Sequence, residues 1–77
     1  MASNEIELKV RHFLQEELMK EQAEFFTLED ELDLDSLDQT ELRVFLTEEF
    51  QVDTDLENVP PEALRTLKNI IALVPAA

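Results

Sequence analysis

Apolar residues recur at helical spacing in three stretches of the chain. In residues 4–20 they are Ile6, Val10, Phe13, Leu14 and Leu18, in 36–50 Leu42, Phe45, Leu46 and Phe50, and in 67–74 Leu67, Ile70, Ile71 and Val74. This spacing places the apolar side chains on one face of a helix. No stretch alternates in the manner of a β-strand, and no internal repeat occurs. The pattern predicts an all-α domain with three main helices.

Capping signals indicate where these helices begin and end. Ser36, with Gln39 three residues later, matches a capping box that would open the second helix. Thr66 is a suitable cap for the last helix, and Pro75 would end it. The predicted helices therefore span about 4–20, 36–50 and 67–74.

The two connecting segments carry different signals. Residues 21–35 lack a helical stripe but contain five large apolar residues set among acids, which are Phe25, Phe26, Leu28, Leu32 and Leu34. They predict an ordered loop that covers the core. Residues 51–65 contain Pro60-Pro61, which forbids a continuous helix unless the prolines open one. We expect one short helix within 55–64.

Length and charge narrow the class of protein. The chain has 77 residues, which is the size of one domain, and its formal net charge is −13. Residues 21–64 hold fifteen acidic residues and one base, Arg43. This excess argues against binding to nucleic acids or to anionic membranes, and it favours partners with basic docking patches.

Targeting and metal-binding signals are weak. No apolar run is long enough to span a membrane and no signal peptide is evident, so we expect a cytoplasmic monomer. The chain has no cysteine for a thiolate metal site and one histidine, His12, which we interpret as a packing or surface residue. EF-hand spacing from Asp33 puts Val44 where the bidentate glutamate belongs. We therefore predict no metal site and no catalytic residues.

The most informative segment is residues 29–42. Its centre, Asp35-Ser36-Leu37-Asp38, is followed by Glu41-Leu42. This segment closely resembles the phosphopantetheine attachment site of acyl carrier proteins. The likeness continues through Leu46, Glu48, Glu49 and Phe50, and Thr66-Leu67 resembles the family's cap of the last helix.

The resemblance implies a fold, a cofactor and a role. The fold would be an acyl-carrier-like bundle, with the short helix between the last two main helices. A magnesium-dependent phosphopantetheinyl transferase, which would read Asp35, would attach 4′-phosphopantetheine from coenzyme A to Ser36. Asp35 and Leu37 would be the cofactor-binding residues beside this serine. The arm would carry acyl thioesters for fatty-acid or polyketide synthesis. No base lies near Ser36 in the sequence to activate it, so we expect it to be another enzyme's substrate and the chain to be no enzyme.

The resemblance also implies two further sets of residues. Docking onto basic patches of a ketosynthase and other synthase enzymes would use an outward face of the second helix, formed by Asp38, Glu41, Val44 and Glu48 beside Leu37. A cavity for the acyl chain would be lined by Leu46, Phe50, Ile70 and Val74. Ordinary core packing explains these four apolar residues equally well.

Departures from the family pattern leave alternatives open. Asp33 stands where a glycine is usual, and Arg43 replaces a residue that is often apolar. If position 33 requires a positive φ, aspartate tolerates it less well than glycine. These changes are consistent with a specialised polyketide or lipid pathway. Two alternatives are an aminoacyl carrier of the peptidyl or D-alanyl type and a helical interaction module that is never modified.

Overall fold

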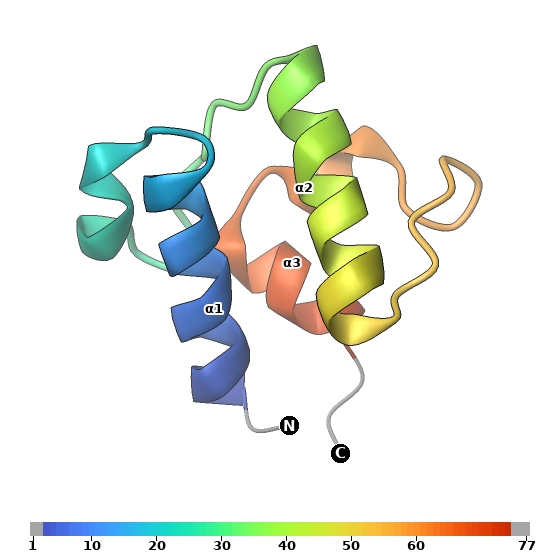
Figure 1. Cartoon of the computed structure of the whole chain (residues 1–77), viewed down its shortest axis with the longest axis horizontal. Coiled ribbons are helices and arrows are strands. Elements are labelled where there is room, and N and C mark those ends of the chain that lie inside the picture. The colour runs from blue at the N-terminus through green and yellow to red at the C-terminus, as the bar shows by residue number, and fades with distance from the viewer. Residues whose placement is uncertain (1–2, 75–77) are drawn as a thin grey trace.

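Three α-helices and two short 3₁₀ helices make up the described part of the chain. The computed structural model describes residues 3–74. The elements are, in chain order, α1 Ser3–Glu16, η1 Glu21–Phe25, α2 Ser36–Phe50, η2 Pro61–Leu64 and α3 Leu67–Leu73 (Figure 1). The described part of the chain contains no β-strand, and an isolated backbone bridge joins Glu31 to Thr66. The predicted all-α class is confirmed, as are the bounds of the second helix.

The core forms where the apolar faces of the three helices meet. Leu42 and Leu46 of α2 are fully buried, as are Val10 and Leu14 of α1 and Ile70 of α3. The other buried apolar residues are Ile6, Leu18, Ala23, Leu32, Phe50, Val52, Val59, Leu64, Leu67 and Val74. The helical spacing therefore identified most of the core, because each stripe faces the other two helices.

The chain contains no glycine, so other residues adopt the left-handed backbone conformations in its turns and at its helix ends. Met19, Asp33 and Gln51 adopt left-handed conformations with φ of 58°, 55° and 56°, a region that glycine usually occupies. Gln51 ends α2, and its N–H bonds to carbonyl groups of the last turn. Met19 follows α1, which ends at Glu16 rather than near residue 20 as predicted. No sequence signal marks this end, since methionine is an unusual residue for a left-handed turn.

Substituting Met19 with glycine is expected to stabilise the protein. Met19 is 77% exposed, so its side chain contributes little packing. Removing the left-handed strain should outweigh glycine's greater flexibility in the unfolded chain and raise the free energy of unfolding by about 0.5–1 kcal/mol. Leu8→Gly, at an exposed position inside α1, is the matched control and should lower it by about 1 kcal/mol. Urea denaturation followed by circular dichroism measures both; a loss of stability in Met19→Gly would contradict the argument.

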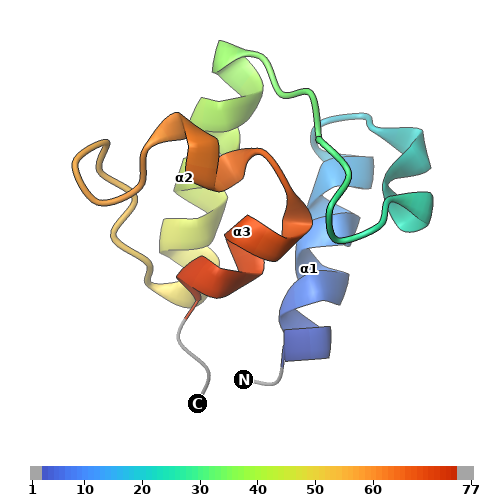
Figure 2. The same cartoon turned by 180° about the vertical axis from the view of Figure 1, so that it is seen from behind.

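The segment before α2 covers the core only in part. Ala23 and Leu32 are buried, but Phe25 and Leu28 are exposed, so the prediction was wrong for these two. The backbone N–H of Leu32 donates to the carbonyl of Arg65 at 2.8 Å. This bond and its neighbours tie the segment to the start of α3, beside which it runs in Figure 2. The segment is therefore ordered by backbone hydrogen bonds and a few buried side chains.

The segment after α2 is anchored by Arg43. Its guanidinium donates to the carbonyl oxygens of Thr54 at 2.6 Å and Val59 at 2.7 Å. The Thr54 hydroxyl donates back to the Arg43 carbonyl at 3.3 Å.

The short helix expected within 55–64 is not confirmed. Pro61 instead opens the single 3₁₀ turn η2, since a proline at the first position has no N–H to leave unpaired.

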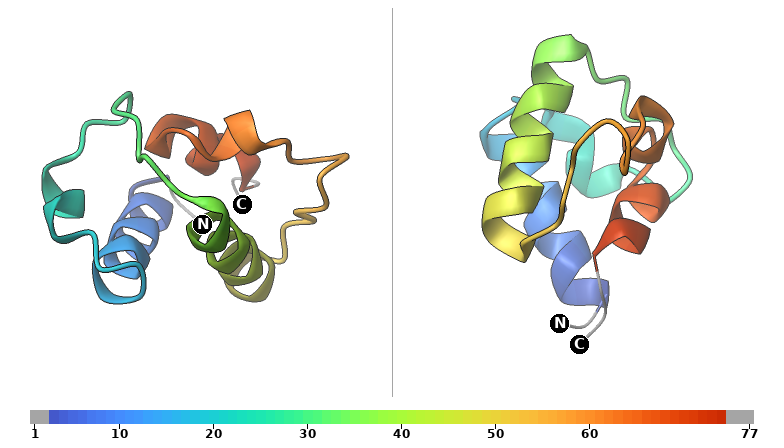
Figure 3. Two further views of the ribbon diagram at one scale, coloured as in Figure 1. Left: turned by 90° about the horizontal axis from the view of Figure 1, so that it is seen from above. Right: turned by 90° about the vertical axis from the view of Figure 1, so that its right-hand side faces the viewer.

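The two poles of the molecule, at the top and bottom of Figure 1, carry different parts of the helices. The start of α1 and the end of α3 lie toward one pole, whereas the first turn of α2 lies at the other (Figures 1 and 3). The segments 21–35 and 51–60 flank the helices on opposite sides (Figure 3, left). Among the described residues, no helix combines the length and apolarity needed to span a bilayer. Pro75, predicted to end the last helix, lies outside the described residues.

Candidate functional site

Ser36 is the first residue of α2 and lies exposed to solvent. Asp35, not Ser36, caps the helix, because its carboxylate accepts the N–H of Asp38 at 2.8 Å. The predicted capping box does not form. Gln39 instead donates its side-chain amide to the carbonyl of Leu34 at 3.3 Å. The carboxylate takes over the capping role and leaves the serine hydroxyl available.

The hydroxyl of Ser36 and two amides beside it are uncommitted. None of the hydrogen bonds in residues 3–74 uses this hydroxyl, and none uses the backbone N–H of Ser36 or Leu37. Amides in the first turn of a helix have no partner within the helix, and the dipole makes this end positive. An anion attached to Ser36 would therefore be stabilised, by about 0.3–1 kcal/mol from the dipole.

The cap itself can be tested through Asp35. Asp35→Ala should lower the free energy of unfolding by about 0.5–2 kcal/mol, since the Asp38 amide loses its acceptor. Asp35→Asn should lose much less, because asparagine caps as well as aspartate but carries no charge. Chemical denaturation distinguishes the two variants, and equal losses would show that charge rather than capping stabilises this helix end.

Lys20 holds the loop before the serine, a role that sequence spacing did not reveal. Its ammonium group lies 3.5 Å from the carbonyl oxygen of Asp33 and 3.8 Å from the carboxylate of Asp38. Asp33, which stands where a glycine is usual, has a backbone φ of 55°. This position therefore adopts the left-handed conformation that glycine favours. A contact between residues 18 positions apart, Lys20 and Asp38, leaves no local pattern to recognise.

Most of the predicted docking residues share an outward face of α2. Leu37 and Val44 are 66% and 52% exposed, and Glu41 and Glu48 are also exposed. Their spacing of three or four residues places them in one row. Asp38 differs, because it is only partly exposed and lies close to Lys20. The face therefore combines two apolar side chains with two acids that form no ion pair within residues 3–74.

The four predicted cavity residues are packed in the core. Leu46 and Ile70 are fully buried, and Phe50 and Val74 are nearly so. A hollow of about 360 Å³ instead lies between the start of α2 and η2. Its lining residues are Glu31, Asp33, Leu34, Gln39, Pro61, Glu62, Leu64 and Arg65. The lining of this hollow is thus largely polar.

His12 is exposed on α1, and its side chain lies 3.8 Å from Glu16 of the same helix. No group of three or more histidine, aspartate or glutamate residues is placed to hold a metal ion in residues 3–74. The arrangement can present one accessible hydroxyl at a positive helix end. No family model, curated protein or solved structure matches the chain, so this interpretation rests on the geometry and on the motif.

Proposed function

We propose that this protein is an acyl carrier protein. Ser36 would carry acyl groups as thioesters on a covalent 4′-phosphopantetheine arm. The observation that carries the proposal is the exposed, uncommitted hydroxyl of Ser36 at the first position of α2, inside the Asp35-Ser36-Leu37-Asp38 motif. A side chain in this position can be reached by a second enzyme.

The residues around Ser36 fit the phosphate of such an arm. The free amides of Ser36 and Leu37 can donate to a phosphodiester, and the α2 dipole favours its charge. The bound group would supply a thiol that forms the thioester. Asp35 holds the first turn in place by capping it. A polar hollow lies beside Gln39, three residues further along α2 than Ser36.

Partners are proposed from the same geometry. A phosphopantetheinyl transferase would read Asp35 and Leu37, and a ketosynthase or related synthase would dock on the row Leu37, Glu41, Val44 and Glu48. Each exposed ion pair contributes about 0–1 kcal/mol, so the complexes would be weak and short-lived. Such exchange suits a carrier that visits several enzymes of a fatty-acid or polyketide pathway in the cytoplasm.

The test is enzymatic attachment of the arm. The purified chain is incubated with coenzyme A, magnesium and a broad-specificity phosphopantetheinyl transferase, and its intact mass is measured. A gain of one phosphopantetheine group supports the proposal. If several transferases leave the mass unchanged, the proposal fails and the unmodified interaction module becomes the better description. Loading with acyl or aminoacyl ligases then distinguishes the two kinds of cargo.

A further inference from the structure

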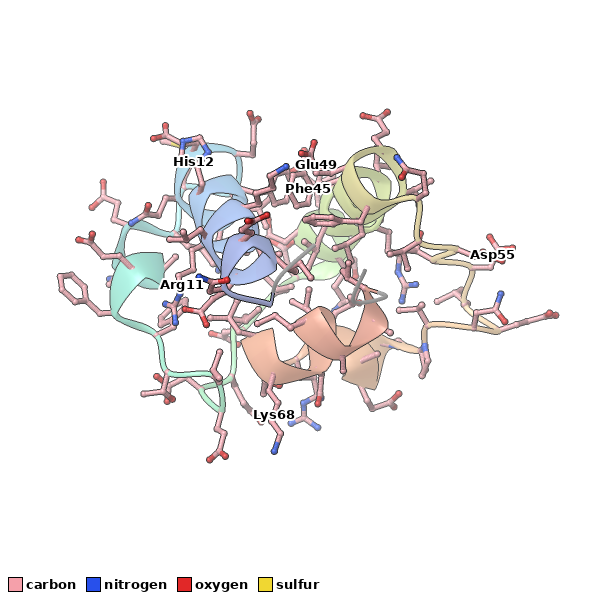
Figure 4. The ribbon with its side chains drawn as sticks, turned by 90° about the horizontal axis from the view of Figure 1, so that it is seen from below. Arg11, His12, Phe45, Glu49, Asp55 and Lys68 are labelled. Carbon is pink, nitrogen blue, oxygen red and sulfur yellow. The ribbon has the colours of Figure 1, made fainter. Side chains whose placement is uncertain are left out.

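A groove of about 500 Å³ runs between α1 and α2, on the side of these helices away from α3 (Figure 4). Its floor contains Phe13 and Phe45, whose rings stack with centroids 4.3 Å apart and an interplanar angle of 14°. The remaining lining residues are Lys9, His12, Glu16, Glu17, Thr40, Glu41, Val44 and Glu48. The groove therefore has an aromatic floor between two helical walls.

The two groove residues that can carry a positive charge both lie near carboxylates of the same chain. Lys9 forms an ion pair with Glu49 at 2.8 Å and lies 5.9 Å from the centre of the Phe50 ring. His12 lies 3.8 Å from Glu16 on the same helix. A carboxylate therefore offsets the charge that either residue can carry.

The acids of the rim are in excess. Within residues 3–74, no ion pair involves Glu17, Glu41 or Glu48, although all three are exposed and line the groove. Glu17 lies on the α1 side and the other two on α2. The apolar floor is thus bordered on both sides by unpaired negative charge.

We infer that this groove binds a cationic amphipathic helix of a partner protein. An apolar stripe on that helix would contact Phe13, Phe45 and Val44, and flanking lysine or arginine residues would face the unpaired glutamates. A helix fits because two helical walls leave a track for a third. A second copy of this chain is a poor occupant, because each copy carries a net charge of −13. The inference rests on the proposed docking role of α2 and extends the surface to α1.

The probe is a synthetic helical peptide of leucine, alanine and lysine. Leucine recurs every third or fourth residue, and lysines flank this stripe. A scrambled peptide of the same composition and a peptide with glutamate in place of lysine serve as controls. All measurements use protein with Ser36→Ala, so that no arm takes part. Calorimetry should detect binding of the first peptide only, and amide chemical shifts should change along the facing sides of α1 and α2.

Two matched pairs of variants locate the site. Glu41→Lys with Glu48→Lys should weaken binding by about tenfold or more, whereas Asp55→Lys with Glu57→Lys, which changes the net charge equally, should alter it by less than about twofold. Figure 4 shows Asp55 on the far side of α2 from α1. Val44→Ser should weaken binding by about threefold, and Leu56→Ser, also exposed, should not.

The outcomes separate this inference from the carrier proposal. Equal binding of the scrambled peptide, equal losses in both charge-reversal variants, or shifts on another face would overturn the groove as a helix site. Failure to bind any peptide would do the same. None of these results affects attachment at Ser36. Conversely, groove binding by a chain that transferases never modify would retain the helix site and remove the carrier.

Discussion

Replacing Ser36 with alanine is expected to abolish attachment of phosphopantetheine completely. Under conditions that convert the wild type fully, the variant should keep its unmodified mass, because alanine has no oxygen to form the phosphodiester. The fold should persist, since the Ser36 side chain is exposed and the Asp35 cap remains. The free energy of unfolding should change by less than about 0.5 kcal/mol. Intact-mass spectrometry of the two proteins measures the effect.

Thr40→Ala provides the control for this loss. Thr40 is also exposed and lies one turn further along α2, where its hydroxyl donates to the carbonyl of Ser36 at 3.0 Å. This variant should be modified as fully as the wild type. Modification of Ser36→Ala would place the arm on another residue. Loss of modification in Thr40→Ala, with Ser36→Ala still modified, would identify the Thr40 hydroxyl as the attachment point. Either result would refute the proposed role of Ser36.

Replacing Leu46 with alanine should produce the largest loss of stability. Leu46 is fully buried in the core, so its truncation removes apolar contacts and leaves a void. Such substitutions cost about 2–5 kcal/mol. A domain of this length has a free energy of unfolding of about 4–12 kcal/mol in total. The variant should therefore unfold at much lower urea concentration, which circular dichroism can follow.

Val44→Ala is the matched control on the same helix. Val44 is exposed, and the free energy of unfolding should change by less than about 0.5 kcal/mol. A cost below about 1 kcal/mol for Leu46→Ala would contradict tight packing around this side chain. That outcome would instead support the earlier prediction that Leu46 lines a cavity for an acyl chain.

Periodic segments were the part of the fold that sequence could predict. In α2, the spacing of Leu42, Leu46 and Phe50 identified both the helix and its buried face. Thr66 was correctly predicted as a cap, since its hydroxyl accepts the N–H of Asn69 at 3.1 Å. The capping signals around Ser36 also located the start of α2 correctly, and the structure adds that the Ser36 side chain is exposed there.

Features that depend on tertiary contacts could not be predicted from local sequence patterns. The end of α1 depends on a left-handed Met19, a conformation that its residue type does not suggest. The role of Arg43 as an anchor depends on carbonyl groups 11 and 16 residues away. The groove between α1 and α2 requires two helices whose angle and spacing no sequence pattern specifies. These features depend on the tertiary structure and have no counterpart in the local sequence.

The arrangement of the two poles has a practical consequence. Because the start of α1 and the end of α3 lie away from the first turn of α2, an affinity tag or a solid support joined beyond either of them would leave the serine facing free solution (Figure 1). The protein could be immobilised on a resin and loaded, washed and sampled in cycles without detaching it. Tagging within the loop around Lys20, by contrast, would crowd the attachment point.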